Sequence, residues 1–180
     1  MKKYICVLMT LFSCSENEKT IPKDFEKVRQ SLPIQEGKNI QYFYTENTEL
    51  KAVLEAPYFK EILDTNRHAI VLFDSSLKIQ FYNSEGKVES QLTAQRGLYH
   101  HKKGYAEAKG KVVVINEKGE KLETEQLFWY KHHDKLSTNA FVKITRQEEI
   151  LFGDSLVSNT SFNNYKIYKL KGRIQKPKDF

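Results

Sequence analysis

Two stretches of the sequence, LTAQRGLYHHKKGYAEAKGKVVV (92–114) and LETEQLFWYKHHDKLSTNAFVKI (122–144), have equal length and share a rhythm. Each opens on leucine, reaches Leu98-Tyr99 or Phe128-Trp129, passes a polar segment with two adjacent histidines and closes on an alternating apolar run. Residues two apart lie on one face of a β-strand. The recurrence at a distance of 30 residues therefore predicts one β-motif laid down repeatedly.

The same period of two runs through most of the chain, with turn signals between the runs. Asn-x-x-Gly turns are expected at 83–86 and 116–119, and glycines mark further turns at 103–104 and 109–110. Only APYFKEILDT (56–65) suggests a helix or an irregular excursion. The predicted strands are 40–45, 50–56, 69–73, 77–83, 88–94, 111–116, 121–130, 141–146 and 165–170.

Corresponding positions of the repeat predict a continuous apolar face. Val112 and Val114 match Val142 and Ile144, and Leu92 and Ala94 match Leu122 and Thr124. Lys111 and Lys143 should point away from that face, because they alternate with its residues. The expected product is all-β: a long, twisted antiparallel sheet, folded so that its apolar faces oppose each other.

The N-terminus has the features of a secretory signal. Lys2-Lys3 precedes the apolar run YICVLMTLF (4–12), which is shorter than the ~20 residues of a membrane span. Leu11-Phe12-Ser13-Cys14 resembles a lipobox, where bacterial lipoproteins are cut and lipidated. Cys6 would be removed with the signal peptide, so Cys14 would be the one cysteine of the mature chain. A lipid attached to its sulfur would explain why this single thiol is present. The alternative is an ordinary cysteine in an ordinary cleavage region.

The expected organisation has four parts: a lipoprotein signal peptide (1–13), a lipidated tether and entry segment (14–38), a β-domain (39–175) and a short tail (176–180). Within the tether, residues 24–32 have the spacing of two helical turns.

Composition and motifs argue against several function classes. Charged residues are 29% of the chain and the net charge is +6, without a basic run, so nucleic acid is not an expected partner. No catalytic motif or metal-ligand set is found, so we expect no enzyme, cofactor or metal. The pairs His100-His101 and His132-His133 fit zinc, solvated turns or contact with lipid phosphates, and solvated turns are favoured because adjacent residues face opposite ways.

Three stretches taken in order resemble the LptC family of periplasmic lipopolysaccharide-transport proteins. They are FYNSEGKVESQLTAQRGLY (81–99), AEAKGKVVVINEKGEKLETEQLFWY (106–130) and ILFGDSLVSNTSFNNYKIYKLKGRI (150–174). The last of them contains Gly153-x-x-Leu156 and Gly172-Arg-Ile174. The resemblance covers about residues 40–174.

The resemblance implies a slightly open β-jelly-roll of two antiparallel sheets. It also implies a carrier that accepts lipopolysaccharide, through its lipid A part, from an inner-membrane ABC transporter and passes it to the next jelly-roll of a periplasmic bridge. Strand addition at 39–45 and 165–174, the expected terminal edge strands, would join the partners. The expected acyl groove is lined by Leu92, Ala94, Val112, Val114, Leu122, Thr124, Ala140, Val142 and Ile144. The alternative is that these residues simply close a core.

Many members of the family are held to the membrane by an N-terminal transmembrane helix, whereas this sequence has a lipobox instead. We expect a periplasmic protein of a Gram-negative bacterium, lipid-anchored to the inner membrane, with the outer membrane left open. Two other functions fit: a surface-displayed β-sheet lipoprotein that binds glycans or protein partners, and a soluble bridge subunit, which the lipobox disfavours. Cell fractionation distinguishes them.

Overall fold

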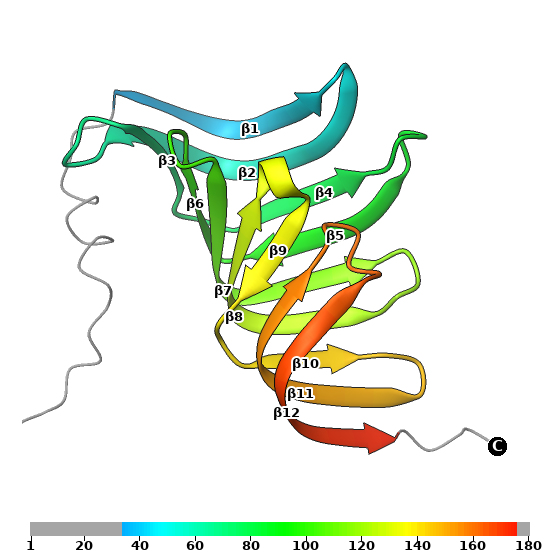
Figure 1. Cartoon of the computed structure of the whole chain (residues 1–180). Helices are drawn as coiled ribbons and strands as arrows, with labels where there is room; N and C mark the ends of the chain where they lie inside the picture. Colours follow the sequence, from blue (N-terminus) through cyan, green and yellow to red (C-terminus); the bar gives the residue numbers. More distant parts are fainter. Residues whose placement is uncertain (1–33, 176–180) are drawn as a thin grey trace, which may run out of the picture. The chain divides into compact units, whose positions relative to one another are not determined.

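The computed structural model describes residues 34–175, and nearly all of them lie in antiparallel strands (Figure 1). The strands are β1 (Gln35–Glu46), β2 (Glu49–Leu63), β3 (Ala69–Phe73), β4 (Leu77–Tyr82), β5 (Val88–Ala94), β6 (Arg96–His100), β7 (Tyr105–Asn116), β8 (Lys121–Tyr130), β9 (Lys135–Thr138), β10 (Val142–Thr145), β11 (Glu149–Ser158) and β12 (Tyr165–Gln175). One short 3₁₀ turn, η1 (Lys131–His133), follows β8. This confirms the all-β class.

The 12 strands form one antiparallel sheet that is folded into two layers. The first half of β7 pairs with β6 and its second half with β5. In the same way β2 pairs with both β4 and β3, while β8 and β11 each pair with both β10 and β9. One layer therefore contains β4, β5 and β10, the other contains β3, β6 and β9, and the long strands run through both. The jelly-roll of repeated hairpins is confirmed, with its two sheets joined as layers of one.

A bulge in β7 marks its passage between the layers. The register with β8 shifts between Lys109 and Val112, and both intervening residues have left-handed backbones, with φ of 76° at Gly110 and 47° at Lys111. A bulge bends a strand and increases its twist. The turn predicted at 109–110 is therefore wrong: the glycine serves a bend within a strand rather than a reversal.

The predicted continuous face is confirmed by the strand register. Leu92 lies opposite Val114, Val114 opposite Leu122, and Leu122 opposite Ile144, which makes one row across four strands. Thr124 similarly lies between Val112 and Val142. Outside this face the Lys143 ammonium pairs with the Glu123 carboxylate at 3.1 Å. The 30-residue repeat is thus one structural period.

The segment 56–65 was expected to leave the sheet, and that prediction is wrong. β2 continues through Pro57, which lies between the part of β2 that pairs with β4 and the part that pairs with β3. A proline has no N–H for a ladder hydrogen bond, and none is required at this gap. Strands β6, β9 and β11 were not predicted; the first two are only five and four residues long.

The two terminal strands are edges of the sheet, as predicted. Among residues 34–175, β1 pairs only with β2 and β12 only with β11. β1 begins at Gln35, four residues before the expected domain boundary, and the Ile34 amide donates to the Glu61 carbonyl at 2.8 Å. The signal peptide, Cys14, the helical turns at 24–32 and the tail at 176–180 lie outside the described residues.

The loop between β11 and β12 connects the two layers at the side opposite the bends. The Ser90 hydroxyl of β5 donates to the Thr160 carbonyl at 2.5 Å, and the Asn116 side-chain amide donates to the Phe162 carbonyl at 2.9 Å. Phe162 is completely buried and stacks on Tyr165 with ring centres 4.9 Å apart. This loop, 159–164, therefore closes the C-terminal half of the space between the layers.

Candidate functional site

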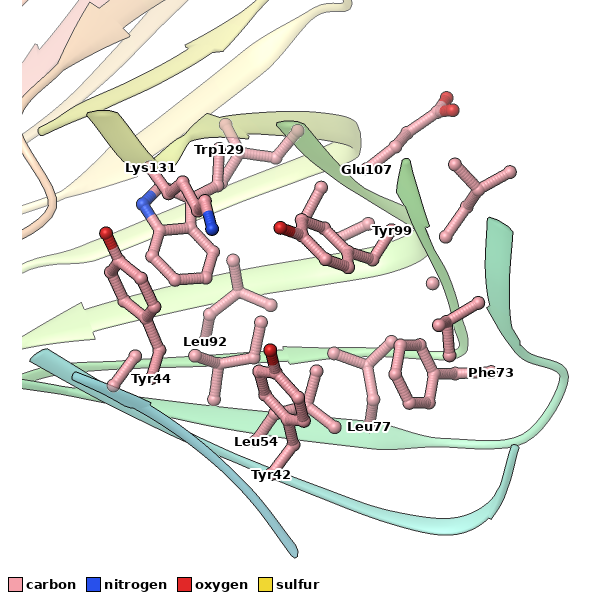
Figure 2. Close-up of a pocket in the computed structure, with 18 of the residues that line it drawn as sticks. Tyr42, Tyr44, Leu54, Phe73, Leu77, Leu92, Tyr99, Glu107, Trp129 and Lys131 are labelled. Carbon is pink, nitrogen blue, oxygen red and sulfur yellow. The ribbon is translucent and has the colours of Figure 1, made fainter. Parts of the chain in front are cut away.

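An apolar slot opens between the two layers at the β1 side of the sheet (Figure 2). The unfilled space between its walls, together with the open solvent at its mouth, amounts to about 790 Å³. One wall comes from β1, β2, β4 and β5, and the other from β3, β6, β7 and β8. Its lining residues are Tyr42, Tyr44, Ala52, Leu54, Val71, Phe73, Leu77, Ile79, Leu92, Gly97, Leu98, Tyr99, His101, Ala106, Glu107, Ala108, Leu127, Trp129 and Lys131.

Small residues keep the slot from being filled by its own walls. Ala52, Ala106 and Ala108 lie among larger apolar neighbours. At Gly97 a Cβ atom would come within 2.4 Å of the Leu77 Cδ2 atom, so a side chain here would displace the opposite wall. Burial of apolar surface contributes about 25 cal/mol per Å², so such a slot suits a hydrocarbon chain without special chemistry.

Trp129 lies at one end of the slot and also lines the adjacent polar hollow. Its ring packs edge-on against Tyr44 at 5.6 Å between ring centres and against Phe81 at 5.1 Å. Tyr44 belongs to β1 and Phe81 to β4, whereas Trp129 comes from the opposite layer. Beyond these rings a polar hollow extends to Thr160 of loop 159–164.

A single lysine marks the mouth of the slot. The Lys131 ammonium lies 4.9 Å from the ring centre of Tyr44 and 5.6 Å from that of Tyr99, so it spans the two layers. Burial by itself lowers the pKa of Lys131, but its interaction with the Tyr99 hydroxyl and the nearby Tyr44 and Tyr42 outweighs this, and the net pKa is raised. Lys131 is therefore charged at neutral pH.

The nine residues predicted for the groove share the interior, but only Leu92 lines the slot. Ala140 is half-buried in the bend between β9 and β10. The rest lie deep in the core, with exposed fractions of 0 to 7%: Ala94, Val112, Val114, Leu122, Thr124, Val142 and Ile144. The Thr124 hydroxyl donates to the Phe141 carbonyl at 2.9 Å, which satisfies it inside the core.

Among the slot residues that were not predicted for the groove are Tyr42, Tyr44, Tyr99, Trp129 and Lys131. A signal was present in the strand predicted at 40–45, where tyrosines at alternate positions face one way. The pattern does not say which distant residues those tyrosines meet, because that depends on how the sheet folds over.

The two members of the first histidine pair have different surroundings in the structure. His100 is 4% exposed, with Nε2 3.6 Å from an Asp64 carboxylate oxygen, whereas His101 is exposed and packs on Tyr99. His132 lies next to Gly104, so the two turns are neighbours. Within residues 34–175 no group of three His, Cys, Asp or Glu side chains is arranged to hold a metal.

A search for membrane-crossing helices in the described part of the chain finds no candidate. Comparison with protein-family models matches residues 4–161 to the family described as "Lipopolysaccharide-assembly, LptC-related". The match runs from the N-terminal region through β11 and the start of loop 159–164. No curated protein matches the chain.

Proposed function

Because the chain belongs to the LptC-related family of lipopolysaccharide-assembly proteins, which act in lipopolysaccharide transport, we propose that it carries lipopolysaccharide or lipooligosaccharide across part of the periplasm. It accepts the glycolipid from an inner-membrane ABC transporter and passes it to the next jelly-roll of a periplasmic bridge. The observation that carries the proposal is the apolar slot between the layers, open at one end of a continuous apolar interior.

An acyl chain of the glycolipid enters at the slot. From the slot the chain follows the row from Leu92 through Val114 and Leu122 to Ile144. The two layers must separate along this row, because its side chains fill the space between them. This keeps the predicted groove residues as the path beyond the slot, with Leu92 at its entrance. The open slot supplies the first contacts at little cost of rearrangement.

The two edge strands support a place in a series of similar domains. β1 exposes Tyr42 and Phe43 to 51 and 58%, and β12 exposes Leu170 and Ile174 to 57 and 54%. An unpaired edge with exposed apolar side chains can accept a strand from another sheet. We propose the transporter and the next bridge domain as the partners at these edges.

The anchor is proposed at Cys14, as a lipid that holds the protein at the inner membrane of a Gram-negative bacterium. Cys14→Ala should leave the precursor uncut, and processing that is unaffected by globomycin would exclude the anchor. Fractionation into the outer membrane with surface exposure would instead favour the glycan-binding lipoprotein.

The carrier function is tested by ultraviolet crosslinking in cells, with photoreactive residues on neighbouring positions of opposite faces. Leu54 lines the slot, while the Glu55 carboxylate outside it accepts from Gln41 at 3.0 Å. Ile144 is buried and Lys143 faces out. We expect lipopolysaccharide adducts at 54, weaker adducts at 144 and none at 55 or 143. Equal adducts on both faces would contradict the proposal.

A further inference from the structure

The mouth of the slot carries polar groups that its apolar lining does not explain. The ammonium of Lys131 and the hydroxyls of Tyr42, Tyr44 and Tyr99 gather around it, from η1, β1 and β6 (Figure 2). An ammonium is a donor only, and a phenol hydroxyl donates readily. Four donors therefore surround one opening whose interior accepts only apolar groups.

The charge of Lys131 is not balanced by an acid. Among residues 34–175 no carboxylate forms an ion pair with it within 4.0 Å. Glu46, Glu89 and Asp134 line an adjacent polar hollow that Lys131 also borders. Burial raises the pKa of the Tyr44 hydroxyl, and Glu46 interacts with that hydroxyl there and raises its pKa further. A half-buried cation whose contacts are aromatic rings and the Tyr99 hydroxyl is stabilised further by an anion that arrives with a ligand.

We propose that Lys131, with Tyr42, Tyr44 and Tyr99, binds a phosphate ester on the headgroup of an acylated ligand whose hydrocarbon chain occupies the slot. This inference rests on the proposed function and identifies the part of the glycolipid that is recognised. A phosphate presents several acceptor oxygens to the four donors. The position of Lys131 at the mouth keeps the headgroup outside while the chain is buried.

The test uses the full-length chain with a photoreactive residue at position 54 in mixed micelles. Lipid A that carries its phosphates is compared with the same lipid A after their removal. A charge-assisted contact predicts about tenfold stronger labelling by the phosphorylated lipid. Lys131→Gln should reduce that labelling to the level of the phosphate-free lipid, and Lys131→Arg should keep most of it.

Lys135→Gln is the matched control, because the Lys135 ammonium lies over the Tyr130 ring at 5.6 Å but outside the slot. It should leave the preference unchanged. Equal labelling by the two lipids in the unsubstituted protein, or a preference that survives Lys131→Gln, would overturn the phosphate site and leave the carrier function standing. No labelling by either lipid would overturn the carrier function, and this inference with it.

Inorganic phosphate distinguishes a lipid headgroup from a free anion. Added alone at the same concentration as the phosphorylated lipid, it should not reduce labelling, because it gains nothing from the apolar slot. Competition as strong as that of unlabelled lipid A would overturn the assignment to a lipid. Thermal unfolding of each variant checks folding, and the comparison of the two lipids in the unsubstituted protein needs no variant at all.

Discussion

Two asparagines build the same local turn in different surroundings. The Asn83 side-chain oxygen accepts from the amides of Glu85 and Lys87, both at 3.0 Å. Asn116 accepts from the amides of Lys118 and Glu120 in the same pattern. Asn116 is also 4% exposed and donates to loop 159–164. The same residue type thus forms only a turn in one place, and in the other also joins the layers.

Asn116→Ala is therefore expected to cost more stability than Asn83→Ala. Loss of Asn116 leaves the buried Phe162 carbonyl without its donor, at about 2 to 3 kcal/mol including the turn. Loss of Asn83 removes turn hydrogen bonds at the surface, at about 1 kcal/mol. Urea unfolding of both variants measures the difference, and equal losses would show that loop 159–164 is not held by this contact.

His100 makes stability depend on pH. Burial lowers the pKa of His100, nearby Lys103 lowers it further, and Asp64 partly opposes the change. The folded protein therefore binds the proton less readily than the unfolded chain, whose histidine titrates near about 6.5. The resulting stability is complete above that pH and is lost as the pH falls below it.

Replacing His100 with Gln should flatten this dependence. We expect the unfolding free energy of the unchanged protein to fall between pH 7.5 and pH 5, and to fall less in His100→Gln. His101→Gln, at the exposed neighbouring position, is the control and should follow the unchanged protein. Identical pH profiles for His100→Gln and the unchanged protein would rule out His100 as the source.

At the scale of elements, the β11–β12 ladder shows why two motif glycines differ. At Gly153 a Cβ atom would come within 2.2 Å of the Ile167 Cγ2 atom, and the Tyr168 carbonyl lies at 3.2 Å. At Gly172 the nearest atom, Phe152 Cδ2, lies at an ordinary 3.6 Å. Only Gly153 is required for the close approach of the two strands.

Gly153→Ala should therefore loosen the edge strand while Gly172→Ala should not. Overpacking at Gly153 is expected to cost about 1 to 3 kcal/mol. Gly172→Ala should be neutral or slightly stabilising, because alanine restricts the unfolded chain. Thermal unfolding, with hydrogen exchange of the β12 amides, measures both effects. A larger loss at 172 than at 153 would show that the ladder packs differently.

At the scale of the whole molecule, folding the sheet over brings distant parts of the chain to one opening. Tyr44 lies in the first strand, and Trp129 and Lys131 lie at and after the end of the eighth. Neither layer alone forms the slot. Its volume depends on the small side chains in its walls, above all that of Ala106 in β7.

Ala106→Phe should block the slot without unfolding the protein. The larger ring occupies space that is now open, and we expect crosslinking of lipopolysaccharide at position 54 to fall by about tenfold. Val113→Phe, on the outer face of the same strand opposite Thr93 and Glu123, is the control and should keep labelling. Unchanged labelling in a folded Ala106→Phe variant would place the lipid elsewhere.

The linear pattern was enough to predict the all-β class, most strands, the Asn-x-x-Gly turns and the shared face of Leu92, Val114, Leu122 and Ile144. These features are local or follow from the period of two along a strand, so a linear pattern contains them. It also predicted the edge strands and the family. It failed at 56–65, where Pro57 is tolerated in a strand because the ladder with β4 ends at Glu55 and the ladder with β3 begins only at Lys60.

Which part of the apolar face is open depends on how the two layers pack against each other. Val142 and Leu92 have the same apolar alternation and both are buried, yet only Leu92 borders the slot. The difference arises because Phe162 and its loop fill the interior near β10, whereas alanines and Gly97 leave it open near β1. Packing between residues far apart in the chain sets that space, and no periodicity along a single strand records it.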